Sequence, residues 1–441
     1  MNAQALQQRL RAADPVLRTG RVRRIMPTYI EADGPNVALG ALCTVEARSP
    51  DGLCEFRAEV VRVNQDNVVL SPFEHGAPTF SGALVTACRE TNNAVPVGDA
   101  FLGRVVDPLG RAIDGAGPIR ADTFEPFANA NVAPLDRTSP ADMLETGIRA
   151  IDGLLTLGIG QRIGIFAASG VGKTSLMGQL ARQVEADVAI LCLVGERGRE
   201  VEAIWTQGLD DEARARTTLV AATSDQPAAM RVRAGHYALA LANHWRARGK
   251  HVLLLLDSVT RLAMAMREIG LAAGEPPTVR AYTPSVFAEI PKMVERCGAL
   301  KMGGAITAIV TVLSETDDID DPICELMKSL LDGHIILSRT LAEQGHFPAI
   351  DVLRSVSRQA EGVVDNTQRR NAVQILEWLS LHENSRTLID TGLYVKGSNA
   401  AIDRAIERHP EIQRFLKQDR DEHCAQSETA ASVSRIAQGR S

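Results

Sequence analysis

The segment AASGVGKTS, at residues 167–175, contains the residue types that a phosphate-binding loop requires. Gly170 and Gly172 allow backbone N–H groups to approach phosphate oxygens, and Lys173 supplies a charge that reaches the β- and γ-phosphates. Thr174 supplies a hydroxyl ligand for Mg²⁺. The candidate phosphate-binding residues are Ala168, Ser169, Gly170, Val171, Gly172, Lys173, Thr174 and Ser175. We therefore predict a site for ATP and Mg²⁺ at this loop.

The surroundings of this segment agree with the motif. The apolar run IGIFA precedes it and the helical pattern TSLMGQLARQV follows, so the loop leads from a strand into the N-terminus of a helix. Ala167 stands where the pattern G-x-x-x-x-G-K-[ST] has its first glycine, which narrows the backbone angles available at that position.

Two carboxylates stand at the ends of apolar runs that are typical of buried strands. HVLLLLD ends in Asp257, which we interpret as the acid on the metal side of the site. LCLVGERGREVE places Glu196 just beyond the apolar run that follows the helix of the phosphate loop, and we interpret Glu196 as the residue that orients the attacking water. The residues expected around it are Arg197, Arg199 and Glu200. An ordinary strand end and a solvated charged loop are the alternative interpretations.

Charge that develops on the γ-phosphoryl oxygens is best stabilised by an arginine, which can come from a neighbouring subunit. Arg261, Arg354 and Arg358 are the candidates. The residues alone leave this choice open, because each arginine could equally form a surface ion pair.

Three patterns divide most of the chain. Short β-type runs separated by turn residues predict a β-barrel, which we place at residues 25–92. Continuous apolar runs alternate with helical patterns at 93–354 and predict a parallel sheet with helices on both faces. Residues 355–441 are expected to form a helical domain, with a frayed tail from residue 426. The chain is thus predicted to be a multidomain α/β protein.

Residues 1–24 precede these domains as a basic arm. Asp14 is the lone acid among several arginines, and apolar residues recur there at helical spacing. One interpretation is a solvated helix that leads into the first strand. The other is an amphipathic arm that binds a partner or anionic lipid.

The composition argues against several classes of protein. A formal charge of −6 and few aromatic residues in the expected barrel do not favour nucleic-acid binding. The seven cysteines form no CxxC pair, which argues against a disulfide framework or a zinc site. No segment reads as a signal peptide or a membrane span, so we expect a cytoplasmic protein.

Several segments stand out as a group: AASGVGKT, LVGERGREVE, LLLLDSVTRLAMAMREIGLAAGEPP, TPSVFAEIPKMVERCG, LDGHIILSR, HFPAIDVLRSVSR and YVKGSN. Together they resemble the ATPase of the flagellar and type III protein-export apparatus. That family is similar to the catalytic subunits of rotary ATP synthases. The resemblance implies a homohexameric ring of RecA-like P-loop domains with nucleotide at each interface.

The resemblance also implies roles for the site residues. Lys173 and Thr174 serve the phosphates and Mg²⁺, and Asp257 is the metal-side acid. Glu196 is the catalytic carboxylate, and Arg358 of SVSR is the arginine finger of the next subunit. The remaining implied assignments are Arg197 and Arg261 near the phosphates, Glu200 bound to the metal through water, and Phe347 of HFPAID against the adenine.

The function implied by this resemblance is protein export energised by ATP hydrolysis, in which chaperone-bound substrates are released or unfolded at a membrane-embedded gate. The implied partners are a peripheral stator-like regulator, a coiled-coil stalk protein, an export-gate membrane protein and export chaperone–substrate complexes. We expect peripheral association with the inner membrane at the export apparatus. YVKGSN and the C-terminal helix pattern favour the flagellar machine over an injectisome.

Three other functions compete with export. A catalytic subunit of a rotary ATP synthase is disfavoured because one chain holds both Glu196 and the SVSR segment. A Rho-type RNA translocase is disfavoured by the acidic charge and the sparse barrel aromatics. A subunit that binds nucleotide without hydrolysing it is disfavoured by the presence of Glu196.

Overall fold

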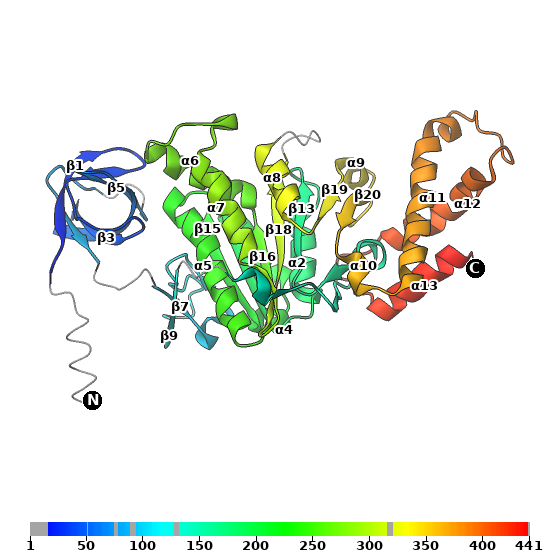
Figure 1. The fold of residues 1–441 in the computed structure, drawn as a ribbon, viewed down its shortest axis with the longest axis horizontal. Helices are drawn as coiled ribbons and strands as arrows, with labels where there is room; N and C mark the ends of the chain where they lie inside the picture. Colours follow the sequence, from blue (N-terminus) through cyan, green and yellow to red (C-terminus); the bar gives the residue numbers. More distant parts are fainter. Residues whose placement is uncertain are drawn as a thin grey trace. The chain divides into compact units, whose positions relative to one another are not determined.

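The computed structural model describes residues 16–50, 52–74, 78–88, 94–127, 132–314 and 321–439. The chain divides into two compact units. One contains the N-terminal barrel with segments 226–230 and 268–276, and the other contains the central sheet and the C-terminal helices (Figure 1). The predicted combination of a barrel, a parallel sheet and C-terminal helices is confirmed.

Six antiparallel strands close the barrel in the order β1-β2-β5-β4-β3-β6. The strands are β1 (Thr19–Ile25), β2 (Ile30–Ala32), β3 (Leu42–Ser49), β4 (Gly52–Val63), β5 (Val68–Pro72) and β6 (Leu84–Ala87). Alternate residues point into the barrel, as Cys43, Val45 and Ala47 of β3 do. Short runs of alternating apolar residues therefore build a closed core with no free sheet edge.

Strand β1 overlaps the end of the stretch that was predicted to be a basic arm. Val22, at its centre, is buried in the barrel core. Arg23 pairs with Asp33 at 3.8 Å, and Arg24 pairs with Glu31 at 3.9 Å, on the exposed side. The barrel thus begins at Thr19 rather than at residue 25, and the arm up to residue 15 lies outside the described residues.

The central sheet follows the order β20-β19-β13-β18-β16-β14-β15-β8, with β17 beside β18 and β10 beside β17. Neighbours from β8 to β19 on this path are parallel, and β20 is antiparallel to β19. The strands are β8 (Arg104–Val106), β10 (Arg137–Thr138), β13 (Arg162–Ala167), β14 (Val188–Glu196), β15 (Thr217–Thr223), β16 (His251–Asp257), β17 (Gly298–Leu300), β18 (Ala305–Leu313), β19 (Gly333–Leu337) and β20 (Ile350–Ser357). Two small sheets pair β7 (Ala94–Val97) with β9 (Thr123–Pro126) and β11 (Met143–Leu144) with β12 (Leu157–Gly158).

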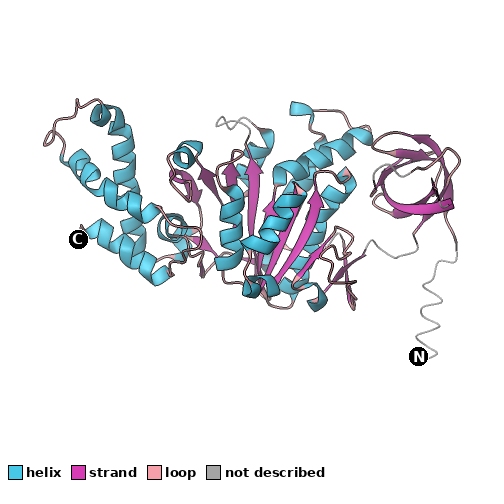
Figure 2. Cartoon of the chain, turned by 180° about the vertical axis from the view of Figure 1, so that it is seen from behind, coloured by secondary structure: helices cyan, strands magenta, loops and turns pink. Residues whose placement is uncertain are grey.

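Helices cover both faces of this sheet (Figure 2). Leu254 and Leu256 of β16 belong to the core shared with α5, α6 and α7, whereas Leu253 and Leu255 belong to the core shared with α2 and the C-terminal helices. The helices are α2 (Lys173–Gln183), α3 (Gly198–Ala203), α4 (Asp211–Ala215), α5 (Ala228–Ala247), α6 (Val259–Ala272), α7 (Pro284–Glu295), α8 (Pro322–Leu330), α9 (Arg339–Glu343), α10 (Ala360–Val363), α11 (Asn366–Asp390), α12 (Ala400–Leu416) and α13 (Gln426–Gln438). Burial on both faces explains why the strands are continuous apolar runs.

The prediction of a frayed tail is wrong, because α13 is a helix packed against the core. Thr429, Val433 and Ile436 are buried, and their spacing of four and three residues places them on one helix face. No helix in the described part of the chain is long and apolar enough to cross a membrane.

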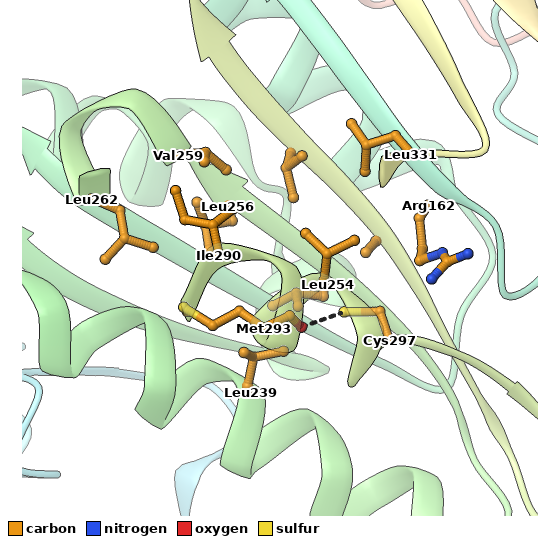
Figure 3. Close-up of a pocket in the computed structure, with 13 residues that line it drawn as sticks. Arg162, Leu239, Leu254, Leu256, Val259, Leu262, Ile290, Met293, Cys297 and Leu331 are labelled. Atoms are coloured by element: carbon orange, nitrogen blue, oxygen red, sulfur yellow. Dashed lines mark hydrogen bonds between the residues drawn. The ribbon is translucent and has the colours of Figure 1, made fainter. Parts of the chain in front are cut away.

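A small cavity of about 30 Å³ lies between the sheet and α7 (Figure 3). Apolar side chains such as Leu254, Leu262 and Ile290 line it, with Arg162 at its edge. Burial raises the pKa of the Cys297 thiol, also in the lining, to about 11, so this group stays neutral. A cavity of this size and polarity is a packing void with too few polar partners to hold a water molecule.

Candidate active site

The phosphate loop joins β13 to α2 through two glycines in the left-handed region. The φ angle is 83° at Gly170 and 94° at Gly172. An added Cβ at Gly170 would meet nothing within 4 Å, so the backbone angle, and not packing, requires glycine there. Ala167 pairs with Leu313 and Leu337 in two parallel ladders. Its extended conformation needs no glycine, which explains the departure from the motif.

Helix α2 begins at Lys173 and has no side-chain hydrogen bond at its N-cap, Gly172. Its first N–H groups therefore lack the partners that a capping side chain would give. An N-terminus of this kind binds anions through its N–H groups and its dipole. The loop and helix thus fit a chain of phosphates.

Lys173 lies between two buried carboxylates. Its Nζ atom is 3.1 Å from Oε1 of Glu196 and 2.5 Å from Oδ1 of Asp257. The two acids are 3% and 1% exposed, and they end the neighbouring parallel strands β14 and β16. Parallel strands end at one edge of a sheet, which is also where the phosphate loop leaves β13. The structure therefore brings these three predicted residues together.

Arg261, in the first turn of α6, joins this group. Its Nε atom lies 3.3 Å from Oε1 of Glu196, and its Nη1 atom donates to the carbonyl of Gly195 at 2.6 Å. Two carboxylates thus face two cations, which is how buried charges are stabilised in proteins. Lys173 and Arg261 are the two cations of this group, and both could pair with a polyanionic ligand at the loop.

Thr174 and Asp257 have the chemistry to hold a magnesium ion. Thr174 directly follows Lys173 and is half-buried in the first turn of α2. The described residues contain no group of three His, Cys, Asp or Glu side chains suited to a metal. Mg²⁺ at nucleotide sites takes one or two protein ligands, with phosphate oxygens and waters in the other positions, so this donor set fits. A bound ion would neutralise charge on the β- and γ-phosphates.

A cavity of about 320 Å³ opens beside the loop. Phe347, a residue that is 48% exposed, lines it, and its ring carbon Cε1 lies 3.6 Å from the position of an added Cβ at Gly172. The other lining residues are Val171, Gly172, Ser175, Leu176, Gln179, Leu337, Pro348, Ala349, Gln418, Asp419 and Arg420. A largely apolar wall with an accessible aromatic ring is suited to a planar base.

Gln418 fixes one wall of this cavity. Its backbone N–H donates to the carbonyl of Phe347 at 2.9 Å, and its side-chain amide donates to the carbonyl of Gly147 at 2.7 Å. Its Oε1 atom accepts from the backbone N–H of Arg149 at 2.8 Å. Because Gln418 directly follows α12 and Lys417, the C-terminal helices contribute to the cavity.

The three charged residues that follow Glu196 lie outside the buried group. Arg197 is the N-cap of α3 and is exposed, as is Arg199. Glu200, in the first turn of α3, is partly exposed. The structure therefore places them at the surface next to Glu196.

Arg358 lies at the opposite edge of the sheet from Lys173. Its neighbour Ser357 pairs with Gly333 at the start of β19, whereas Leu337 at the end of β19 pairs with Ala167 at the loop. The two edges are separated by the length of β19, about 13 Å at about 3.3 Å per residue. Arg358, which directly follows β20, is exposed, and so is Arg354 within that strand.

The side chain of Arg358 is held at the end of α8. Its two Nη atoms donate to the carbonyls of Leu331 and Lys328, each at 3.3 Å, and its backbone N–H donates to the carbonyl of Asp332 at 2.9 Å. Asp332 in turn holds Arg162 with two hydrogen bonds of 3.0 Å, which raise the pKa of that guanidinium. Three hydrogen bonds thus anchor Arg358 at this end of the sheet.

Comparison with known proteins identifies the chain. Residues 147–357 match the nucleotide-binding domain of the ATP synthase alpha/beta family, and residues 364–435 match the T3SS EscN ATPase C-terminal domain. The flagellum-specific ATP synthase of Bacillus subtilis (strain 168) is 42% identical over 442 residues, covering 99% of both chains. The chain belongs to the family of flagellar and type III secretion ATPases. It is an ATP-hydrolysing enzyme of this family, as the resemblance implied.

Solved structures agree with this assignment. The assembled ATPase EscN from the type III secretion system of enteropathogenic E. coli superposes on this ATPase with a TM-score of 0.89 and 39% identity, over 95% of this chain and 100% of EscN. The structure of EscN in complex with its central stalk EscO gives a TM-score of 0.86 and 38% identity with the same coverage.

Two parts of the site in this ATPase were missed by the sequence analysis. The segment 418–420 lines the cavity, but it lies far along the chain from the loop and carries no recognisable pattern. Thr311 donates a hydrogen bond of 2.6 Å to Asp257. The sequence feature that could have pointed to Thr311 is a hydroxyl-bearing residue within the apolar run AITAIVTVL.

Proposed function

We propose that this ATPase works as a homohexameric ring in which neighbouring subunits share each ATP site. One subunit contributes Lys173, Glu196 and Asp257, and the next contributes Arg358. The observation that carries this proposal is the position of Arg358 at the sheet edge opposite its own phosphate loop. An anchored, exposed arginine at that edge can meet the loop of another copy. The solved EscN is described as an assembled ATPase, which supports a ring.

Within this shared site each residue has a separate role. The loop amides and Lys173 bind the phosphates, and Arg261 adds positive charge beside Glu196. Thr174 and Asp257 would hold Mg²⁺, and Glu200 would act on it through water. Glu196 orients the attacking water, and Arg358 stabilises the charge that develops on the γ-phosphoryl group. Arg197, exposed at the start of α3, is assigned to the phosphates.

Phe347 is proposed to stack on the adenine. Replacing Phe347 with alanine is expected to raise the dissociation constant for a fluorescent ATP analogue about tenfold, because stacking on an aromatic ring contributes about 1 to 3 kcal/mol per base. Phe347→Trp should keep the affinity within a few-fold of the unaltered chain. Phe124→Ala removes an exposed phenylalanine elsewhere and is the control. Unchanged binding by Phe347→Ala would show that the base lies elsewhere.

We further propose that the ring energises the export of flagellar proteins by releasing or unfolding chaperone-bound substrates. The name of the Bacillus subtilis relative supports the flagellar assignment, and the complex of EscN with its stalk EscO supports a stalk protein as partner. An injectisome is the second candidate, since EscN belongs to such a system. A regulator, an export gate and a membrane-peripheral location complete the proposal.

Deleting the gene from its own bacterium is expected to abolish flagellar filaments. The unaltered chain should restore swimming and hook-protein export when supplied in trans, whereas Lys173→Ala should not, because it removes the phosphate-binding charge. Lys250→Ala, which alters an exposed lysine paired with Asp187, is the matched control and should restore both. A deletion strain that still swims but no longer secretes injectisome proteins would replace the flagellar function with the second candidate.

A further inference from the structure

Strand β18 lies between β13, which leads into the phosphate loop, and β16, which ends in Asp257. A side chain near the carboxyl end of β18 therefore sits between the two halves of the nucleotide site. The strand is buried almost throughout, and its polar members are Thr307 and Thr311, both 0% exposed. Buried hydroxyls of this kind need hydrogen-bond partners.

The partner of Thr311 is the metal-side acid of the site. Its hydroxyl donates to Oδ1 of Asp257 at 2.6 Å, and the same oxygen accepts from Nζ of Lys173 at 2.5 Å. Both of these hydrogen bonds end on Oδ1 of Asp257. Two donors thus fix one oxygen of the carboxylate, and neither of them occupies Oδ2.

We propose that Thr311 is a positioning residue for metal-dependent hydrolysis, which holds Asp257 by Oδ1 so that Oδ2 is available to the Mg²⁺ ion of the bound nucleotide. This inference rests on the proposed role of Asp257. When phosphates draw Lys173 away from the carboxylate, Thr311 is the donor that stays, because it belongs to a buried strand with ladder hydrogen bonds on both sides. The carboxylate therefore keeps its orientation while the nucleotide exchanges.

Thr307 shows what a structural threonine on this strand looks like. Its hydroxyl accepts from the backbone N–H of Gly160 at 2.8 Å and lies 2.8 Å from Nε2 of His251. Both partners are at the amino edge of the sheet, away from the phosphate loop. Thr307 and Thr311 therefore have the same residue type, strand and burial, but they differ in whether the hydroxyl contacts the site.

Thr311→Val keeps the shape of the side chain and removes the hydroxyl. We expect the binding of metal-free ATP analogue to stay within about twofold of the unaltered chain, while the Mg²⁺ concentration needed for half-maximal binding of the metal–nucleotide complex rises about tenfold, as expected when one partner of a buried hydrogen bond is lost. The turnover number should fall by a similar factor. Thr311→Ser restores a donor and should recover both quantities to within about threefold.

Two further variants make the outcome decisive. Thr307→Val is expected to lower the thermal midpoint without changing the Mg²⁺ dependence, which separates loss of a buried hydroxyl from loss of the contact to Asp257. Asp257→Asn should itself raise the Mg²⁺ concentration needed for half-maximal binding of the metal–nucleotide complex. If Thr311→Val needs the same Mg²⁺ concentration as the unaltered chain while Asp257→Asn needs more, the role of Thr311 is overturned and the metal site at Asp257 stands. A normal Mg²⁺ dependence in Asp257→Asn overturns both that role and the proposed metal site.

Discussion

Replacing Arg358 with alanine is expected to reduce ATP turnover by about 10³-fold or more, the effect of removing an arginine finger, while nucleotide binding is retained. This change leaves the charged group at the phosphate loop intact, because Arg358 lies at the other edge of the sheet. The group consists of Lys173, Glu196, Asp257 and Arg261. Folding should also be retained, since the side chain is exposed and loses only its two hydrogen bonds to the end of α8. Steady-state turnover and analogue binding, measured on the same preparation, test both halves of this expectation.

Mixing two inactive variants tests whether the site is shared. A Lys173→Ala chain keeps Arg358, and an Arg358→Ala chain keeps Lys173, so a mixed ring has some interfaces with both residues intact. Random assembly at equal amounts gives such interfaces about one time in four, and activity should recover toward that fraction. Arg354→Ala is the matched control, because it removes an exposed arginine of β20, four residues before Arg358. A mixture as inactive as its components would contradict sharing, as would normal turnover by Arg358→Ala.

The phosphate loop could be predicted from the sequence because its determinants are local. Two glycines, a lysine and a threonine within a few residues specify the turn, and the flanking strand and helix read clearly. The proximity of Glu196 and Asp257 followed from a general property of parallel sheets, whose strand ends share one edge. The start of the barrel was placed too late, because Arg21, Arg23 and Arg24 were counted with the basic arm although they belong to β1.

The rest of the site could not be predicted because it depends on contacts between distant segments. Gln418 reaches the cavity through hydrogen bonds to Phe347 and Gly147, and nothing in the sequence near residue 418 records those partners. Thr311 reads as an ordinary core residue until its neighbour across the sheet is known. Choosing Arg358 over Arg261 and Arg354 required the family resemblance. The sequence around a single arginine does not indicate whether its side chain acts in its own subunit or in a neighbouring one.

Glu196→Gln is expected to reduce turnover by about 10² to 10⁴-fold, the range for loss of a general base, with the ring still assembled. The amide keeps the size of the side chain and can still accept a hydrogen bond from Lys173, so the site should keep its shape. It cannot take a proton from the attacking water. Single-turnover hydrolysis with excess enzyme measures this step without interference from product release.

The same substitution makes a second, opposite prediction for binding. Glu196 is 3% exposed and pairs with both Lys173 and Arg261, so its negative charge competes with phosphate for the two cations. Neutralising it should leave the affinity for ATP unchanged or increase it. Glu202→Gln alters an exposed glutamate of the nearby helix α3 and should change neither quantity. Turnover at the normal rate in Glu196→Gln would remove the carboxylate from the mechanism, and weaker ATP binding would mean that Glu196 shapes the site instead of acting on water.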